Sequence, residues 1–260
     1  MKITIHKAEN YEAMRKSGKL AAQVLDYIAD FVKPGVTTLE LNDLCHKMIL
    51  ENDAIPAPLN YRGFPKSICT SINHVVCHGI PDERKLKEGD IVNIDVTVIT
   101  KEGWYGDTSR MYFVGEVPIK AKKLVQKTYD VMMLGIEQVK PGAYVGDIGY
   151  AIQTEAEKSG YSVVRDYCGH GIGQIFHGLP NIVHYGRRGE GELLLEGMFF
   201  TVEPMINIGK KETKLKPDGW TVVTKDLSLS AQFEHTIAVT KDGYEIFTQS
   251  PKGLHFPPYK

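Results

Sequence analysis

A repeated pattern of helix, VKPG turn and helix constrains the fold of this chain more than any other feature of its sequence. VKPG occurs at residues 32–35 and again at 139–142, an offset of 107 residues. A second echo aligns KEGDIVNID (87–95) with LEGMFFTVE (195–203), at an offset of 108 residues. Each echo is short enough to arise by chance, but two nearly equal offsets predict two similar halves related by a pseudo-two-fold axis.

The chain length fits a single domain built from these two halves. At 260 residues the chain is longer than an average domain but within the range of one large α/β fold. We therefore predict an α/β protein with one domain over residues 1–260. Its halves are placed at about 10–115 and 116–240.

Apolar residues recur at helical spacing before both VKPG turns, and Pro-Gly is a typical helix end. The first stripe comprises Leu20, Ala21, Val24, Leu25, Ile28 and Phe31, and the second comprises Leu124, Val125, Tyr129, Met132, Met133 and Ile136. Both patterns predict amphipathic helices. After the first turn, Thr37 and Glu40 have the spacing of a capping box, which predicts the start of another helix.

The segment IVNIDVTV (91–98) reads as a strand with one apolar and one polar face. Asp95 shares the polar face with Asn93 and Thr97. The segments FFTVEPMI (199–206) and SAQFEHTIAV (230–239) also read as strands, and they carry Glu203 and Glu234.

A turn at residues 100–103 predicts that this strand continues into a hairpin that carries Asp107 on its second arm. If the hairpin folds symmetrically about Lys101, Asp95 lies directly opposite Asp107. Directly opposed like charges destabilise a sheet. Protonation or a bound cation relieves such repulsion, and a cation that bridges two carboxylates explains the arrangement most directly.

His170 lies between two glycines in YCGHGIGQIFHGLP, where the small neighbours would let the backbone crowd an ion or a substrate. Four carboxylates and one imidazole form a hard, oxygen-rich ligand set. Such a set suits two divalent ions of the Mn, Fe or Co kind and, less distinctively, Zn. Paired metals of this kind activate water, so hydrolysis is the predicted reaction class.

Composition excludes partners that are recruited by overall charge. Lys and Arg number 31 against 32 Asp and Glu, which predicts no attraction to DNA or to an anionic membrane. The sequence contains no apolar run of about 18 residues, so we expect neither a signal peptide nor an anchor, and a cytoplasmic protein. Its four cysteines lack CxxC spacing and are expected to be reduced thiols.

Five ordered motifs together resemble the bacterial type I methionine aminopeptidases over nearly the whole chain: NIDVTV, GWYGDTSRM, CGHGIG, FTVEPMI and SLSAQFEHTIAVT. The resemblance implies the pita-bread fold, two pseudo-symmetric α/β halves around a curved antiparallel sheet with flanking helices. It also implies a monomeric, cytoplasmic methionyl aminopeptidase. Such an enzyme uses metal-activated water to remove the initiator methionine from nascent polypeptides when the second residue is small.

The resemblance also implies the ligands of a dinuclear site that holds Co, Mn, Fe or Zn. Asp107 and Glu234 would bridge two ions, Asp95 would chelate one, and His170 and Glu203 would complete the other. Glu203 would also be the general base.

Two histidines and a set of pocket residues have implied roles in binding the substrate. His177 would polarise the scissile carbonyl, and His78 would contact the peptide near the cut. The methionine side chain would be bound by Tyr61, Phe64, Cys69, Phe176 and Trp220. The chain departs from the commonest bacterial pattern beside the cleft, at Arg62, Gln174 and Gly178.

Three alternatives share the fold. Proline-specific aminopeptidases and dipeptidases carry the same ligands, but usually after an extra N-terminal domain, whereas only about thirty residues precede the first VKPG. Type II methionine aminopeptidases have a helical insertion for which the spacing from His170 to Glu234 leaves no room. A non-catalytic binding module would have lost ligands that are all present here. The ribosome near its exit tunnel is a candidate partner implied by the resemblance alone.

Overall fold

The structure is a computed structural model that describes residues 2–259. Its helices are α1 (Ala8–Ile28), α2 (Thr38–Glu51), α3 (Ile119–Ile136) and α4 (Val145–Lys158), with the 3-10 turns η1 (Ala29–Phe31) and η2 (Tyr61–Gly63). The strands are β1 (Ile55–Pro56), β2 (Cys69–Ile72), β3 (Val75–Cys77), β4 (Ile91–Ile99), β5 (Tyr105–Phe113), β6 (Ser162–Val163), β7 (Gly169–Gly171), β8 (Gly178–Ile182), β9 (Phe199–Val202), β10 (Met205–Asn207), β11 (Thr213–Leu215), β12 (Val222–Thr224), β13 (Ser230–Gln232), β14 (His235–Val239) and β15 (Tyr244–Ile246).

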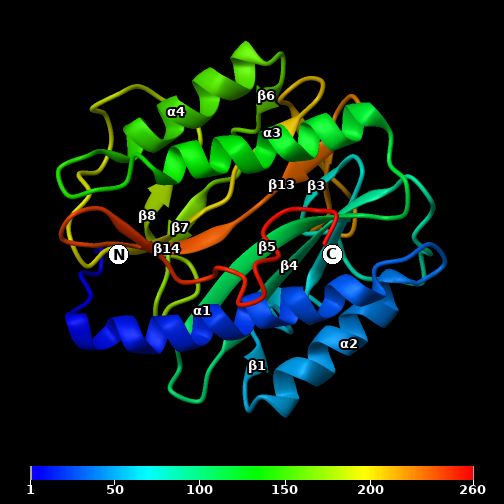
Figure 1. Ribbon diagram of the computed structural model, residues 1–260, viewed down its shortest axis with the longest axis horizontal. Coiled ribbons are helices and arrows are strands. Elements are labelled where there is room, and N and C mark those ends of the chain that lie inside the picture. Colours follow the sequence, from blue (N-terminus) through cyan, green and yellow to red (C-terminus); the bar gives the residue numbers. More distant parts are fainter. Residues whose placement is uncertain (1, 260) are drawn as a thin grey trace.

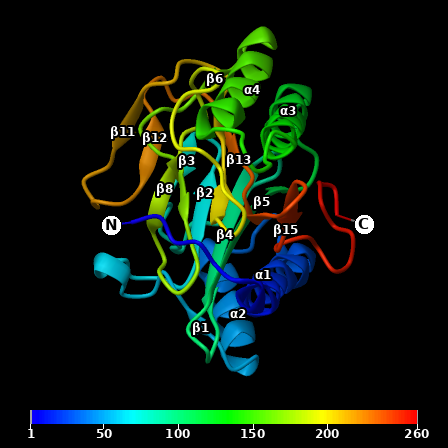
Figure 2. The ribbon, with the colours of Figure 1, turned by 90° about the vertical axis from the view of Figure 1, so that its left-hand side faces the viewer.

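Two pairs of helices flank a central layer of antiparallel strands, which confirms the predicted α/β class. In Figure 1, α3 and α4 lie above the strands, and α1 and α2 lie below them. The largest sheets have the strand orders β15-β14-β9-β7-β8 and β1-β4-β2, with β5 paired to β4. Figure 2 shows β11 and β12 on the side of the molecule away from α1 and α3. Within residues 2–259, no helix is both long and apolar enough to cross a bilayer.

The two VKPG turns make equivalent hydrogen bonds in the two parts of the chain. The Gly35 N–H donates to the Leu86 carbonyl at 2.8 Å, and the Gly142 N–H donates to the Leu194 carbonyl at 3.0 Å. Both glycines have left-handed φ values, 93° and 87°, which side chains rarely adopt. These partners follow the sequence offsets of 107 and 108 residues. The bounds of the halves, 10–115 and 116–240, stay a prediction.

The predicted helices are confirmed as α1 and α3, and the capping box starts α2 as expected. The Glu40 N–H donates to the Thr37 hydroxyl at 3.1 Å, and the Thr37 N–H donates to Glu40 Oε2 at 2.6 Å. Each bond satisfies a backbone donor that the first turn of a helix leaves free.

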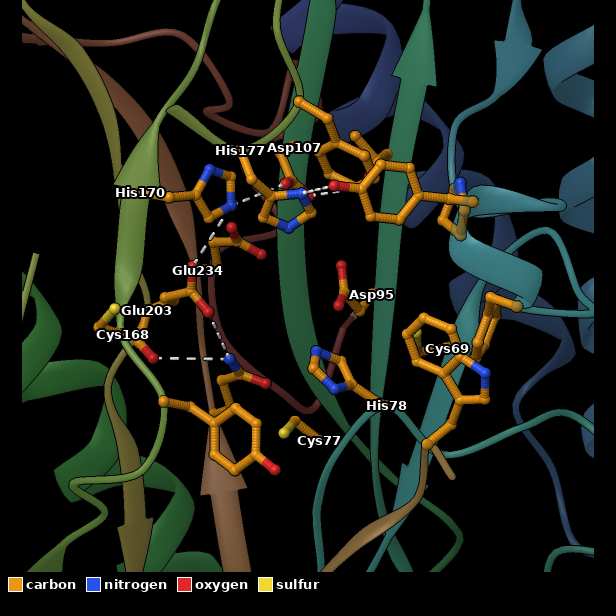
Figure 3. Close-up of a pocket in the computed structure, with 18 of the residues that line it drawn as sticks. Cys69, Cys77, His78, Asp95, Asp107, Cys168, His170, His177, Glu203 and Glu234 are labelled. Atoms are coloured by element: carbon orange, nitrogen blue, oxygen red, sulfur yellow. Dashed lines mark hydrogen bonds and ion pairs between the residues drawn. The ribbon is translucent and has the colours of Figure 1, made fainter. Parts of the chain in front are cut away.

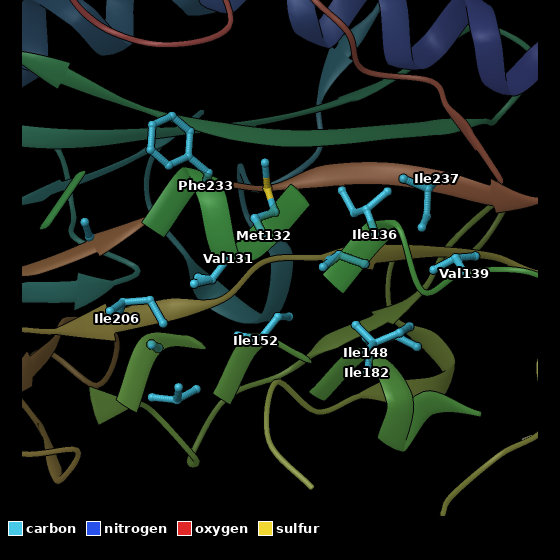
Figure 4. Close-up of a cluster of buried hydrophobic side chains, with 14 of the residues drawn as sticks. Val131, Met132, Ile136, Val139, Ile148, Ile152, Ile182, Ile206, Phe233 and Ile237 are labelled. Carbon is cyan, nitrogen blue, oxygen red and sulfur yellow. The ribbon is translucent and has the colours of Figure 1, made fainter. Parts of the chain in front are cut away.

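A large apolar cluster fixes α3 and α4 against the strands of the second half (Figure 4). Met132 and Ile136 of α3, Ile148 and Ile152 of α4, and Phe233 after β13 are all at most 1 % exposed. Burying a side chain of this size stabilises the fold by roughly 1.5–3 kcal/mol. The cluster therefore holds the helices firmly behind the strands that carry Glu203 and Glu234.

The register of the β4–β5 hairpin differs from the predicted one. Asp95 pairs with Ser109, and Thr97 pairs with Asp107, so the two aspartates are not directly opposed. The reason is the length of the turn. The Thr100 N–H donates to the Trp104 carbonyl at 3.0 Å, which leaves a three-residue loop whose last residue, Gly103, has a left-handed φ of 78°. The hairpin is therefore centred one residue later than Lys101, and Asp95 and Asp107 are diagonal neighbours.

Two segments predicted as continuous strands are each interrupted at a glutamate. The chain leaves β9 at Glu203–Pro204 and continues as β10 in a different sheet, and it leaves β13 at Phe233–Glu234 and continues as β14. Pro204 has no N–H for a ladder bond, so a strand break there is expected. Both glutamates consequently lie where the chain crosses between sheets.

Hydrogen bonds join β5 of the first half to the segment around Glu234. The Glu234 N–H donates to the Ser109 carbonyl at 3.1 Å, and the Thr108 hydroxyl donates to the Glu234 carbonyl at 2.7 Å. The Thr236 hydroxyl donates to the Asp107 carbonyl at 2.6 Å. This seam places Asp107 and Glu234 side by side at the centre of the molecule.

A buried ion pair ties α1 to the back of β5. Arg110 Nη1 lies 2.6 Å from Asp26 Oδ1, and the two side chains are only 3 % and 2 % exposed. The Ser250 hydroxyl donates to the same carboxylate oxygen at 2.7 Å, so the C-terminal segment joins the network.

We expect Asp26→Ala to lower the free energy of unfolding by about 3–5 kcal/mol, because Arg110 would be left buried without a counter-charge. Chemical denaturation monitored by circular dichroism measures the change. Glu116→Ala, which removes an exposed partner 3.0 Å from Lys122 Nζ, is the matched control and should cost at most about 1 kcal/mol. Equal effects of the two variants would contradict the assignment.

Candidate active site

A cavity of about 410 Å³ opens where the two halves meet, and residues from both halves line it. All the residues predicted to act in catalysis, substrate binding or metal binding line this one cavity: Tyr61, Phe64, Cys69, His78, Asp95, Asp107, His170, Phe176, His177, Glu203, Trp220 and Glu234. Figure 3 shows the carboxylates and His170 turned towards one another on one side. Residues far apart in the sequence therefore form a single site.

Asp107, His170 and Glu234 form the closest group of potential metal ligands. Each offers a donor atom, and these atoms all lie within 4.8 Å of one another. His170 Nε2 is 3.5 Å from Asp107 Oδ2. Since divalent metals bind nitrogen and oxygen donors at about 2.0–2.2 Å, donors this close together can share one ion.

Glu203 and Asp95 lie at the edges of this group. Glu203 Oε1 is 3.8 Å from His170 Nε2. Asp95 projects from β4 between Cys69 of β2 and Ser109 of β5, and it lines the cavity without belonging to the closest group.

The carboxylates are buried together with little positive charge to balance them. Burial, followed by the charges of Asp107 and Glu203, raises the pKa of Asp95 well above its usual range, and similar causes raise the pKa of Glu234. Burial raises the pKa of Glu203 to about 7, although the charge of His170 opposes the shift.

The balance of charge in the cavity favours a bound metal. Among the described residues that line it, Arg62 is the one lysine or arginine. Buried carboxylates without cations must take up protons or bind metal ions. The donor set and its charge therefore fit a divalent metal.

Three polar side chains that the sequence analysis left without a role hold the carboxylates in place. The Thr97 hydroxyl donates to Asp107 Oδ1 and the Thr201 hydroxyl to Glu203 Oε1, both at 2.8 Å. Gln232 Nε2 donates to Glu203 Oε2 at 3.2 Å. Each of the three lies two positions from a predicted ligand in the sequence, and this spacing puts alternate strand residues on one face. That spacing was the signal that could have identified them.

The glycines beside His170 have a different purpose from the one predicted. A Cβ at Gly169 would meet the Thr201 carbonyl, and a Cβ at Gly171 would meet the Leu179 carbonyl. The two glycines therefore allow close approach of β9 and β8 rather than of an ion or substrate. The His170 N–H donates to the Thr201 hydroxyl at 3.0 Å, which fixes the short strand that presents the imidazole.

His177 lies at the edge of the cavity and is held by Tyr61. Its Nδ1 is 2.9 Å from the Tyr61 hydroxyl, and its ring centroid is 4.0 Å from that of Phe176. Desolvation lowers the pKa of His177 to about 4, with a contribution from the positive charge of His170. The imidazole is therefore neutral at pH 7.

His78 also faces the cavity, from a left-handed backbone conformation with a φ of 55°. Non-glycine residues in this region are uncommon and cluster at functional sites. Burial lowers the pKa of His78, so this ring too is neutral at pH 7.

The side of the cavity away from the carboxylates is aromatic. The Phe64 and Trp220 rings meet edge to face with centroids 5.2 Å apart, and Tyr61 and Phe176 are 4.9 Å apart. The Cys69 thiol is buried beside them, and burial raises its pKa, so it stays uncharged. An apolar, polarizable slot of this kind suits an aliphatic or thioether side chain.

Comparison with known protein families identifies relatives with this arrangement. The metallopeptidase family M24 matches residues 12–241 of the chain. The methionine aminopeptidase of Rickettsia prowazekii is 69 % identical over 260 residues, which covers both chains completely.

Solved structures agree with the sequence comparison. The crystal structure of the R. prowazekii methionine aminopeptidase superposes with a TM-score of 0.94 and covers 95 % of this chain and 100 % of that one. The methionine aminopeptidase of Thermotoga maritima, 40 % identical, gives a TM-score of 0.92 over 95 % and 99 % of the two chains. The prolidase of Pyrococcus furiosus, at 21 % identity and a TM-score of 0.75, shares the fold, but the match covers only 65 % of that chain. These similarities confirm the pita-bread fold.

Proposed function

Since this chain belongs to metallopeptidase family M24 and to the methionine aminopeptidases within it, we infer that it removes the initiator methionine from nascent polypeptides when the second residue is small. The observation that carries this inference is the cluster of Asp107, His170 and Glu234 beside an aromatic slot in one cavity. The cluster supports hydrolysis, and the slot supports recognition of methionine.

Two divalent ions, of Co, Mn, Fe or Zn, are the proposed cofactors, with Asp95, Asp107, His170, Glu203 and Glu234 as their ligands. When bound, such ions activate water and stabilise negative charge. Four carboxylates and two divalent ions have formal charges that cancel, which supports a pair of ions rather than one.

Glu203 is the proposed general base. Thr201 and Gln232 hold its two carboxylate oxygens, so the group is fixed where it can accept a proton from the attacking water. The same carboxylate can then deliver the proton to the amine that leaves when the peptide C–N bond breaks.

His177 and His78 are proposed to bind the peptide at the bond to be cut. With the Tyr61 hydroxyl donating to Nδ1 of His177, the ring proton lies on Nε2, where it can donate to the carbonyl oxygen of the substrate. His78 would contact the peptide backbone from the other side of the cavity. Tyr61, Phe64, Cys69, Phe176 and Trp220 would enclose the methionine side chain.

A peptide assay tests the function directly. We expect release of methionine from Met-Ala-Ser, loss of that activity with a chelator, and recovery when Mn or Co is added back. Peptides that begin with Pro or Leu should react at least on the order of 10²-fold more slowly. Preferred release from a Pro-containing peptide would support a proline-specific enzyme, and no release with any metal would support a non-catalytic binding module.

The proposed setting is a cytoplasmic monomer that acts on nascent chains near the ribosomal exit tunnel. The four free cysteines support a reducing compartment. A cavity whose catalytic groups all come from one chain supports activity as a monomer. The ribosome stays a prediction of the family resemblance.

A further inference from the structure

Arg62 stands apart from the other charged residues of the cavity. Its side chain is exposed and lines the cavity, and its guanidinium lies 5.3 Å from the centroid of the Tyr61 ring. None of the ion pairs formed within residues 2–259 involves Arg62. Its positive charge is therefore free to meet a ligand.

The backbone presents Arg62 from a tightly bonded turn. Its φ is 49°, in the left-handed region that arginine seldom adopts, and the flanking residues Asn60 and Gly63 also have positive φ values. The Asn60 N–H donates to the Phe64 carbonyl at 2.8 Å, and the Phe64 N–H donates to the Tyr61 carbonyl at 2.9 Å. The turn holds the start of the arginine side chain in one place, beside Tyr61.

Positive charge at this position is not neutralised by the rest of the cavity. With two divalent ions bound, the formal charges of the central carboxylates cancel. The other charged residue that lines the cavity is Asp166, whose Oδ2 already accepts a bond of 2.6 Å from the Thr213 hydroxyl. The charge of Arg62 reaches inward as far as His177, whose pKa it helps to lower after larger contributions from burial and His170.

The position of Arg62 relative to His177 indicates which part of a peptide it meets. Tyr61 links the two, because its hydroxyl is 2.9 Å from His177 and its ring lies under the guanidinium. On the proposed function, His177 binds the carbonyl after the first residue. An extended chain advances about 3.3–3.6 Å per residue. The third or fourth residue of the substrate therefore passes the guanidinium.

We propose that Arg62 is a specificity-determining residue that favours substrates with a carboxylate side chain at the third or fourth position. This inference rests on the proposed function and adds a preference beyond the second residue. A cation at the mouth of a cleft attracts an anionic peptide and forms an exposed, charge-assisted contact with it. Because Arg62 lies away from the scissile bond, the preference belongs to KM rather than to kcat.

The test uses pentapeptide amides, because the free C-terminal carboxylate of a short peptide would itself bind Arg62. We compare Met-Ala-Glu-Ser-Gly, Met-Ala-Lys-Ser-Gly and Met-Ala-Gln-Ser-Gly amides, and a second series with the variable residue fourth. At low ionic strength, kcat/KM should favour a Glu peptide over its Lys counterpart about fivefold in at least one series, as expected for an exposed ion pair. The ratio should fall towards one as salt is added.

Substitutions at Arg62 complete the experiment. Arg62→Lys should retain the preference, Arg62→Gln should remove it, and Arg62→Glu should reverse it. The ratio of two substrates on one preparation does not depend on the folded fraction, so partial misfolding does not obscure the result. Arg188→Glu is the matched control, because this exposed arginine also lies over a tyrosine ring, 4.8 Å from the Tyr150 centroid, but outside the cavity.

Three outcomes would overturn the proposal: equal rates for the Glu and Lys peptides in the unmodified protein, an equal shift in the Arg188→Glu control, or a preference that lies in kcat alone. Failure to release methionine from any of the peptides, including the neutral Gln peptide, would instead reject the proposed function.

Discussion

Asp107→Asn is expected to lower kcat/KM for methionine release by at least about 10³-fold, together with a loss of bound metal. Asp107 is the carboxylate nearest to His170, and it belongs to the closest group of ligands. Asparagine keeps the shape of the side chain and an oxygen that can accept the Thr97 hydroxyl, but it removes the negative charge that attracts a cation. Metal analysis and peptide assays measure the two effects.

The stability of the same variant provides a second measurement, with a definite sign. In the metal-free protein, removal of one of several buried like charges should raise the melting temperature of the variant relative to the unmodified chain. Added Mn or Co should stabilise the unmodified protein and have little effect on Asp107→Asn, because a ligand stabilises only a state that binds it.

Asp90→Asn is the control, since Asp90 is also buried but binds Asn73 and Lys87 outside the cavity. An Asp107→Asn protein with normal metal content and activity would refute the assignment of Asp107.

His177→Ala is expected to lower the rate of methionine release by on the order of 10²-fold while metal content stays nearly unchanged. The variant loses the donor that we assign to the carbonyl oxygen, but none of the proposed ligands. Tyr61→Phe should have a smaller effect, because the ring of His177 would remain and only the 2.9 Å bond that orients it would be lost.

His46→Ala serves as a control for removing an imidazole, since His46 pairs with Ser67 and does not line the cavity. Metal lost in proportion to activity in His177→Ala would instead make His177 a ligand, contrary to our proposal.

Much of the candidate site could be read from the sequence. Family motifs named twelve residues, and the structure brings all of them to one cavity. The hydrogen bonds of Thr97 and Gln232 could not be read in the same way. Their spacing places them on the face that carries Asp95 and Glu234, yet Thr97 bonds Asp107 and Gln232 bonds Glu203. Both partners lie on other segments, and periodicity within one strand does not determine which segment is its neighbour.

Local sequence determined the elements themselves. The apolar stripes of α1 and α3 follow from the 3.6-residue period of a helix, and the capping box of Thr37 and Glu40 involves only three intervening bonds of the chain. The faces of β4 follow equally from its two-residue period. Such features depend on residues within one or two turns of each other, so they are determined before the chain packs.

The tertiary structure alone decided which charges meet. A loop of three residues moved the hairpin register so that Asp95 lies opposite Ser109, and the crossings at Glu203 and Glu234 directed these side chains to the seam between sheets. One residue of slip changes every cross-strand partner, and the side chains at a seam are positioned by packing against both halves. The sequence by itself therefore determined which residues carry the chemistry, whereas their mutual distances depend on contacts between segments more than a hundred residues apart, which no local pattern encodes.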